Sequence, residues 1–244
     1  MTPLAIDLFC GLGGWTEGLL AEGYRVIGFD IERHQYGDAK YPAQLVLQDV
    51  LTIHGKQFKN AALIVASPPC QEFSYMAMPW SKAKAKRAAI LEDHAERKRL
   101  TALFDACFRI QREAIEAAGH FIPLVVENVR GANEWVGRSR WNFGSFHLWG
   151  DVPALMPMVR KATKVPGFRF DGSGGSFQTA SVDCVIEGTK NGRDWFGSGE
   201  NCSLQRCAGS KSSARKAASA AIAKIPLMLS RHIAQVYKPR ESCI

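Results

Sequence analysis

The sequence lacks three features that would assign it to common specialised classes. No stretch of its 244 residues approaches the run of about 20 apolar residues that a membrane-spanning helix needs. Its N-terminus has no basic segment ahead of an apolar core, so we expect no signal peptide. The seven cysteines are an odd number without tight repeated spacing, which argues against a disulfide framework. These absences predict a protein of a reducing cytoplasm.

A metal site is not indicated either. The sequence contains no Cys-x-x-Cys pair, and Cys184, Cys202 and Cys207 have no accompanying ligand pattern. His147 and His232 are too scattered to complete a zinc set. We therefore expect free cysteines and no bound metal.

Acidic residues are scarce in two parts of the chain. Residues 201–240 contain eight basic residues and no acidic one, and residues 82–99 contain seven basic against three acidic. The net charge of the whole chain is +8. Basic blocks attract polyanions because neutralised phosphates release condensed counterions. Nucleic-acid binding and a merely solvated basic surface both fit this composition.

Short apolar runs alternate with helical segments in the first half of the chain. The candidate strands are residues 4–9, 24–30, 44–50, 61–67 and 121–128. The candidate helices are residues 15–23 and about 88–118. Strands separated by helices imply β-α-β units, and nearly continuous apolar runs suit strands buried on both faces. The pattern predicts an α/β fold with a doubly wound, mostly parallel sheet.

The second half of the chain changes character. Residues 150–215 are rich in Gly, Ser, Arg and Lys and lack helical periodicity, which predicts a small loop-rich subdomain. Residues 225–237 resume an amphipathic helix with Pro226 in its first turn. We therefore divide the chain into a main domain (1–149), a variable region (150–215) and a C-terminal helix returning to the main domain (216–244).

A glycine-rich turn follows the first candidate strand, in the string "DLFCGLGGWTEG". Glycines 11, 13 and 14 let a backbone approach a ligand closely and aim helix N-terminal amides at it. Asp30 ends the second strand, where nucleotide-binding folds place a carboxylate on ribose hydroxyls, and Asp49 ends the third. The turn lacks the further glycine of the dinucleotide fingerprint. We expect a cofactor with an adenosine and no pyrophosphate.

Two reactive side chains follow the next two strands. Cys70 lies in "SPPCQEFS" at the edge where open α/β sheets bind ligands, and two prolines stiffen its turn. A small buried cysteine is the ordinary alternative to a nucleophile. Glu127 emerges from the apolar "LVV", where desolvation would raise its pKa and let it donate a proton. A strand-end carboxylate in water is the alternative there.

Basic side chains near these motifs have two interpretations each. Arg138 and Arg140 share one face if the chain is extended, and they suit a phosphate or a base carbonyl, or else a solvated surface. Lys82, Lys84 and Lys86 fit a loop that faces phosphates, or the solvated start of a helix.

These strings together resemble the DNA cytosine-5 methyltransferases. "DLFCGLGG", "GFDIE", "LQDV", "SPPCQEFS", "ENV" and "GRSR" occur in that family's order and approximate spacing. The resemblance covers residues 4–140 well and the C-terminal helix weakly, and residues 150–215 fall where the family keeps its target-recognition region. It implies a Rossmann-like S-adenosylmethionine-dependent methyltransferase fold. It also implies a monomeric enzyme of the bacterial cytoplasm that acts on double-stranded DNA, and the compact chain suggests a phage origin by analogy.

The resemblance implies a catalytic role for four residues. Cys70 would add to carbon 6 of a flipped-out cytosine, so that carbon 5 can take a methyl group. Glu127 would hydrogen-bond or protonate N3 of the base. Arg140 would contact the base oxygen, and Arg138 would support that site or a phosphate. The residues expected to contact substrate are Pro69, Gln71, Ser74 and Asn128.

The resemblance also implies a set of contacts to S-adenosylmethionine. Asp30 would hold the ribose hydroxyls, although the family more often has Glu there. Phe9 would lie against the adenine, and Asp49 would accept from its amino group. The other expected contacts are Gly11, Leu12, Gly13, Gly14, Ile31 and Lys224.

Three departures from the family pattern leave alternatives open. Val136 stands where the family has Gln, the variable region is short, and Ala223 and Lys224 replace a Gly-Asn pair near the methionyl end. A lysine there suggests carboxy-S-adenosylmethionine and carboxymethyl transfer, whereas lysines usually face solvent or phosphate. A catalytically silent DNA-binding relative and the same chemistry on RNA are further alternatives.

Overall fold

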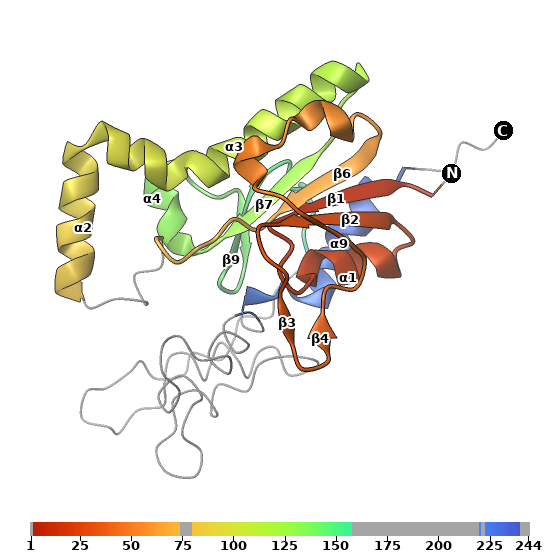
Figure 1. Ribbon diagram of the computed structural model, residues 1–244, viewed down its shortest axis with the longest axis horizontal. Coiled ribbons are helices and arrows are strands. Elements are labelled where there is room, and N and C mark those ends of the chain that lie inside the picture. The colour runs from red at the N-terminus through yellow and green to blue at the C-terminus, as the bar shows by residue number, and fades with distance from the viewer. Residues whose placement is uncertain (1, 74–79, 158–219, 221–222, 240–244) are drawn as a thin grey trace, which may run out of the picture.

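The structure, a computed structural model, describes residues 2–73, 80–157, 220 and 223–239. Its main sheet has seven strands in the order β5-β2-β1-β6-β7-β9-β8 (Figure 1). The parallel strands are β5 (Gln44–Leu47), β2 (Arg25–Asp30), β1 (Leu4–Leu8), β6 (Ala61–Ala66) and β7 (Leu124–Asn128). β9 (Phe146–Gly150) is antiparallel to both β7 and β8 (Trp141–Phe143). The predicted α/β fold with a mostly parallel sheet is confirmed.

Helices cover both faces of this sheet. α1 (Gly14–Ala21) and α9 (Leu227–Tyr237) pack on one face, and α3 (His94–Ala118) packs on the other (Figure 1). Strand β7 shows why its sequence is continuously apolar. Val126 faces the α3 side, whereas Val125 faces the α1–α9 side, and both are fully buried.

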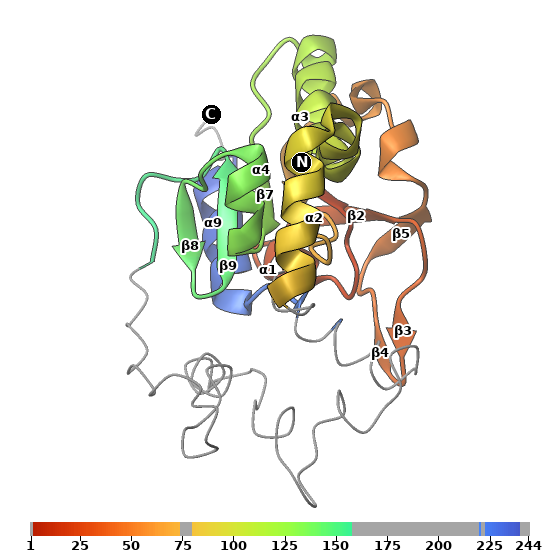
Figure 2. The same ribbon diagram turned by 90° about the vertical axis from the view of Figure 1, so that its left-hand side faces the viewer.

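Short elements join these layers. They are the two-stranded sheet of β3 (Gln35–Tyr36) and β4 (Ala39–Lys40), the 3-10 helices η1 (Val50–Thr52), η2 (Gly55–Phe58) and η4 (Arg130–Ala132), and the helix α4 (Asn133–Val136). Figure 2 shows β8 and β5 at opposite edges of the main sheet. No helix in the described ranges is long and apolar enough to cross a membrane.

The helix expected at about 88–118 is in fact two helices. α2 (Trp80–Glu92) ends before Asp93, whose carboxylate accepts hydrogen bonds from the amides of Ala95 and Glu96 and so caps α3. A side chain that satisfies orphan amides starts a new helix, and the charged run on either side conceals this break from periodicity alone. α3 ends at Gly119, which has a φ of 70°.

Two further details differ from the sequence expectations. The antiparallel pair β8–β9 was not expected, and the strand predicted at 121–128 begins only at Leu124. Most of the predicted variable region falls in 158–219, outside the described residues, so the domain division stays a prediction.

Helices α1 and α9 touch backbone to backbone. A Cβ on Gly18 would lie 2.1 Å from Ser230 Oγ and 2.6 Å from the Arg231 amide nitrogen. The Tyr24 hydroxyl donates to the Ala234 carbonyl at 3.0 Å. This close packing fixes α1, and with it the glycine turn at its N-terminus.

Candidate functional site

The glycine turn leaves β1 in a strained conformation. Phe9 has a φ of 58°, and no other non-glycine residue in the described ranges has a positive φ. A bulky residue in the left-handed region costs on the order of 1–3 kcal/mol and often marks a functional site. Gly13 (φ 79°) precedes α1, and a Cβ on it would lie 2.6 Å from Pro42 Cδ. A Cβ on Gly14 would lie 2.3 Å from the Ile225 amide nitrogen. Close packing on both sides therefore requires glycine here.

Asp30, at the end of β2, holds the glycine turn. Its Oδ2 accepts from the Gly11 amide at 2.9 Å, and its Oδ1 accepts from the Ile31 amide at 2.8 Å and lies 3.4 Å from His34 Nε2. Burial would raise the pKa of Asp30, but hydrogen bonds from His34 and Gly11 outweigh it, and the net shift is downward. The carboxylate is therefore ionised, and Oδ2 keeps a lone pair for a further donor.

A second acid lies deeper, and the sequence prediction missed it. Asp7 in β1 is buried, its Oδ2 accepts from Thr16 Oγ1 at 2.6 Å, and its Oδ1 has no partner among the described residues. Thr16 Oγ1 also lies 2.6 Å from the Tyr41 hydroxyl. Burial raises the pKa of Asp7 to about 7. An acid inside the apolar string "AIDLF" is the one signal that was available in the sequence.

Three other residues predicted to contact the cofactor have different surroundings. Asp49 caps η1 by accepting from the Leu51 amide at 2.9 Å. Ile31 is 74% exposed. Lys224 contacts the position that a Gly14 Cβ would take, and its ammonium pairs with Glu17 Oε1 at 2.5 Å. We call the ends of β5, β2 and β1, with Phe9–Gly14, Asp30 and Asp49, the glycine edge.

Cys70 lies in a turn that two distant side chains fix. The buried Asn128 donates from Nδ2 to the Pro68 carbonyl at 3.0 Å, and Trp15 Nε1 donates to Ser67 Oγ at 3.0 Å. Burial and the negative charge of Glu127 raise the pKa of the Cys70 thiol. The thiol is therefore neutral at rest. Asn128 thus bonds the turn that carries Cys70, and its predicted contact with substrate stays a prediction.

The chain after Cys70 is tied to α3. Glu72 accepts two hydrogen bonds from Arg99, at 3.0 and 2.8 Å, in a bidentate pair. The Phe73 amide donates to the Cys70 carbonyl at 3.0 Å, which closes a turn. Glu127, at the end of β7, is only 8% exposed, and its charge acts on Cys70. We call the ends of β6 and β7 and the start of β9, with Cys70 and Glu127, the thiol edge.

The two predicted arginines lie at the surface, after α4. Arg138 and Arg140 are exposed and flank Ser139. The Arg140 amide donates to the Leu148 carbonyl at 2.8 Å, and its positive charge acts on the phenol of Tyr237. Tyr237 donates its hydroxyl to the Asp151 carbonyl.

The position of Asp151 shows where that contact lies along the sheet. The Asp151 amide donates to the carbonyl of Leu124, the first residue of β7, at 2.7 Å. Glu127 is three residues further along that strand, about 10 Å away at the usual rise per residue. Tyr237 therefore reaches the other end of β7, whereas the Arg140 amide bonds Leu148, the register partner of Glu127, and the predicted role of Arg140 at the base stays a prediction.

Comparison with known families finds one family whose model matches part of this chain. Residues 4–97 match the family model of the C-5 cytosine-specific DNA methylases. This methylase segment contains the glycine turn, Asp30, Asp49 and Cys70, so the resemblance is confirmed for these residues. Glu127, Arg138 and Arg140 lie beyond it. Among curated proteins, no relative matches the chain.

Solved structures of methyltransferases also align with the chain. A structure from E. coli, described as a candidate DNA modification methyltransferase encoded within a prophage, is 20% identical, with 54% of this chain and 33% of that chain covered and a TM-score of 0.34. The S. pombe Dnmt2 methyltransferase is 17% identical (56% and 37% covered, TM-score 0.35). The Entamoeba histolytica methyltransferase EhMeth is 19% identical (56% and 41% covered, TM-score 0.35).

These alignments are partial on both sides. The matched part of this chain spans between a third and about two fifths of the length of those structures. The sheet order, and not this likeness, defines the fold described above.

Several residues considered in the sequence analysis lie outside the described ranges. Ser74, Cys184, Cys202 and Cys207 are among them. The side chains of Lys82 and Lys86 are also not described, whereas Lys84 is exposed on α2. Among the described residues, Cys10, Cys70 and Cys107 are free thiols, and no group of three potential ligands could hold a metal ion.

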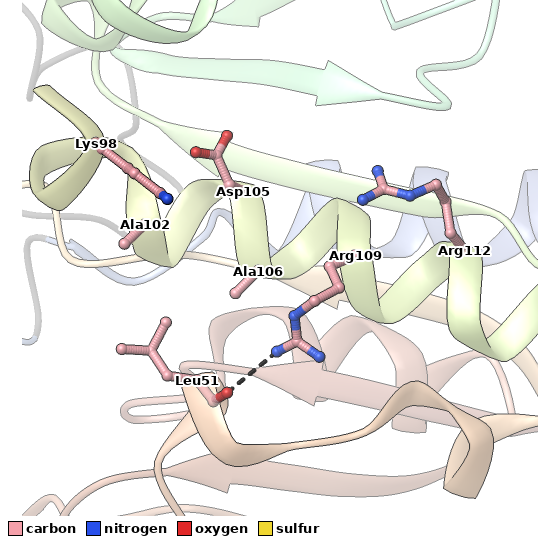
Figure 3. A pocket seen from close by; sticks show the side chains of 7 residues that line it. All are labelled: Leu51, Lys98, Ala102, Asp105, Ala106, Arg109 and Arg112. Carbon is pink, nitrogen blue, oxygen red and sulfur yellow. Dashed lines mark hydrogen bonds between the residues drawn. The ribbon is translucent and has the colours of Figure 1, made fainter. Parts of the chain in front are cut away.

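A pocket of about 320 Å³ lies between α3 and Leu51 of η1 (Figure 3). Arg109 crosses it and donates to the carbonyls of Leu51 at 3.2 Å and Ile53 at 2.8 Å, so its guanidinium already fastens η1 to α3. Neither Cys70 nor Glu127 lines this pocket. It is a groove between η1 and α3.

Proposed function

We propose that the protein transfers the methyl group of S-adenosylmethionine to carbon 5 of a flipped-out cytosine in double-stranded DNA, through a covalent Cys70 adduct at carbon 6. The observation that carries the proposal is one sheet edge with two complementary parts. An ionised Asp30 and the glycine turn end β2 and β1, while Cys70 and Glu127 end β6 and β7. In open α/β sheets, ligands bind along this edge.

The residues of the glycine edge fit S-adenosylmethionine. Gly11 has no atom within 4 Å of the position a Cβ would take, so its backbone is open to a ligand, whereas Gly13 and Gly14 pack against Pro42 and Ile225 and hold the turn in place. Asp30 Oδ2 has a lone pair for a ribose hydroxyl, and Asp49 has a second carboxylate oxygen for an adenine amino group. When bound, the cofactor supplies an electrophilic methyl group.

The thiol edge would activate the base through coupled protons. Because the charge of Glu127 contributes to the raised pKa of Cys70, a proton on Glu127 makes the thiolate easier to form. Glu127 can pass that proton, or share it in a hydrogen bond, to N3 of the cytosine while the thiolate adds to carbon 6. The ring then carries an enamine whose carbon 5 takes the methyl group. The carbon-5 proton then leaves to solvent, the N3 proton returns to Glu127, and the thiolate departs to release 5-methylcytosine.

Covalent trapping tests the proposal. A duplex carrying 5-fluorocytosine, which has no carbon-5 proton to lose, should form a stable adduct with the wild type and cofactor. The C70S variant should form none. DNA binding without any adduct, at every candidate sequence in a mixed-sequence duplex, would favour a silent DNA-binding relative. An RNA duplex of matched sequence, tested in parallel, separates the two nucleic acids.

The alternative to methyl transfer is transfer of a carboxymethyl group to the same carbon. Lys224 lies against Gly14 and so close to the glycine turn, which supports a role near the cofactor. Its ammonium, however, already pairs with Glu17, which favours methyl transfer because a neutralised cation attracts a second carboxylate weakly. Mass spectrometry of nucleosides from DNA modified with each cofactor decides. 5-Methylcytosine alone, with both cofactors supplied, excludes the alternative.

A further inference from the structure

The two carboxylate oxygens of Asp30 differ in how much room they leave for a ligand. Among the described residues, Oδ2 accepts only from the Gly11 amide, at 2.9 Å, and so has a lone pair left. Oδ1 already has three donors, the amides of Ile31 at 2.8 Å and Glu32 at 3.3 Å and the His34 Nε2 atom at 3.4 Å. A carboxylate oxygen has two lone pairs, so Oδ1 is saturated. A ligand with two adjacent hydroxyls therefore meets only one open acceptor on this side chain.

We propose that His34 binds the ribose of the cofactor together with Asp30. The ligand class is a nucleoside with a vicinal diol. Asp30 Oδ2 accepts from one hydroxyl. Oδ1 accepts from the neighbouring hydroxyl in place of its contact with His34, and His34 Nε2 donates to the oxygen of that same hydroxyl. The inference rests on the proposed function and adds one residue to its cofactor site.

His34 is the donor on Oδ1 that is most easily redirected. Ile31 and Glu32 donate from backbone amides, which the chain fixes next to Asp30, whereas the imidazole belongs to a side chain that can rotate. Its contact with Oδ1 is also the longest of the three, and hydrogen bonds beyond about 3.2 Å are weak. The side chain of His34 is 21% exposed, so a ligand can reach it. Exchange of this long contact for a hydroxyl oxygen leaves the imidazole with a hydrogen bond.

The β3–β4 hairpin holds the imidazole in this place. Tyr36 lies two residues beyond His34, its hydroxyl is 3.4 Å from His34 Nδ1, and the two ring centroids are 6.3 Å apart. Burial and the charges of Glu32 and Asp30 raise the pKa of Tyr36, so its hydroxyl keeps a proton to donate. Glu32 Oε1 lies further from the same nitrogen, at 3.9 Å. When Tyr36 donates to Nδ1, the neutral imidazole carries its own proton on Nε2, the atom next to Asp30.

The far end of the hairpin is anchored beside the glycine turn. Tyr41 follows β4, is buried, and has its hydroxyl 2.6 Å from Thr16 Oγ1. A Cβ on Gly28, in β2, would lie 2.3 Å from the Tyr41 hydroxyl oxygen, so the phenol packs directly on the strand that ends in Asp30. The hairpin that carries His34 is therefore fixed to the glycine edge at both ends.

A cycle of protein variants and ligands tests the contact. The probe is S-adenosylhomocysteine, compared with its 2′-deoxy and 3′-deoxy analogues, and affinities are measured by calorimetry. H34A should bind the complete probe about three- to tenfold more weakly than the wild type, as expected for loss of one neutral hydrogen bond. With the analogue that lacks the hydroxyl bound by His34, H34A and the wild type should bind equally. H34Q keeps a donor nitrogen and should recover part of the lost affinity.

The controls separate a ribose contact from a structural role. H120A, at an exposed histidine before β7, should bind all three ligands as the wild type does. Thermal unfolding of each variant checks that it is folded. An equal loss in H34A for the probe and both analogues would overturn the inference, because His34 would then only support Asp30 or the hairpin. An H34Q variant that binds the probe no better than H34A would also contradict it.

The outcomes distinguish this inference from the proposed function. If the wild type traps 5-fluorocytosine DNA and H34A binds the probe as tightly as the wild type, the inference alone fails. If the wild type binds the probe but never traps DNA, the proposed methyl transfer fails, and the affinities in the cycle still decide the ribose contact. If the wild type does not bind the probe, both fail.

Discussion

The glycine edge and the thiol edge lie side by side on one sheet, yet they hold their polar groups in opposite states. At the glycine edge, Asp30 is ionised because amide and histidine donors outweigh its burial. At the thiol edge, Cys70 is kept neutral by burial and by Glu127, and His147 is kept neutral by burial and by Arg130. The first edge presents an ionised carboxylate that accepts hydrogen bonds. The second edge retains its protons at rest.

The two edges also differ in what stabilises them. Backbone amides fix Asp30, so this part is organised by local chain geometry. Long-range side-chain bonds fix the Cys70 turn, from Asn128 and Trp15. Substitutions should therefore divide the two edges into ligand affinity on one side and rate on the other.

The largest expected effect isolates the thiol edge. C70S should lower the turnover by at least about 1,000-fold, as loss of a nucleophile does in other enzymes, because a serine hydroxyl is a much weaker nucleophile. Cofactor affinity, measured by calorimetry, should stay that of the wild type because the glycine edge is untouched. Methylation by C70S at a rate near wild type would remove the covalent mechanism.

A pH effect isolates the buried acid beneath the glycine edge. Asp7 has a pKa raised from 3.8 to about 7, so the folded protein keeps a proton that the unfolded chain releases. The free energy of unfolding should therefore fall as pH rises between these two values, with a slope of up to about 1.4 kcal/mol per pH unit. D7N cannot titrate and should lose this slope.

Urea unfolding at several pH values compares the wild type with D7N. Asp30 serves as an internal contrast, because its lowered pKa contributes stability that is present above its ordinary value of 3.8 and lost only below it. Parallel curves for the wild type and D7N across the window would show that Asp7 is ionised in the folded protein.

A third substitution isolates cofactor affinity. D30N removes the charge that accepts from Gly11 and from a ribose hydroxyl, and we expect affinity about 10- to 100-fold weaker, since hydrogen bonds to charged groups contribute about 1.5–3 kcal/mol. D38N, at an exposed aspartate, is the matched control. At saturating cofactor the rate of D30N should recover. If the rate of D30N stays low at saturating cofactor, the glycine edge affects the rate as well as cofactor affinity.

The smallest expected effect concerns the support of the thiol. N128A leaves the Pro68 carbonyl without its donor inside the protein, at a cost of about 1–3 kcal/mol in the free energy of unfolding. Adduct formation should slow while cofactor affinity is retained. N60A, at an exposed asparagine, should change neither quantity. Equal stability of N128A and wild type would assign the positioning of Cys70 to its prolines alone.

The sequence was sufficient for the elements that carry their own periodicity. The parallel strands are apolar runs because both faces are covered, and the groups at their carboxyl ends could be assigned to one edge before any contact was known. Asp30 and Cys70 were identified in this way. The match of residues 4–97 to the methylase family supports the same residues.

What the sequence could not provide depends on pairing between distant residues. β8 has only three residues, and only the pairing of β9 with β7 places His147 opposite Asn128. Considered on sequence alone, His147 was weighed only as a metal ligand. Likewise, the Thr16–Tyr41 contact that accompanies Asp7 joins residues 25 positions apart with no shared motif.

The contact between Gly18 and Ser230 has a kinetic consequence. Glu22 accepts a hydrogen bond from Arg231 across 209 positions of sequence, so α1 is completed by a segment that is synthesised much later. Contacts of such long sequence separation slow folding, because loop closure must precede them. The glycine turn at the start of α1 is therefore synthesised well before the helix that supports it. Nascent chains in which α9 has not yet emerged from the ribosome should bind cofactor poorly.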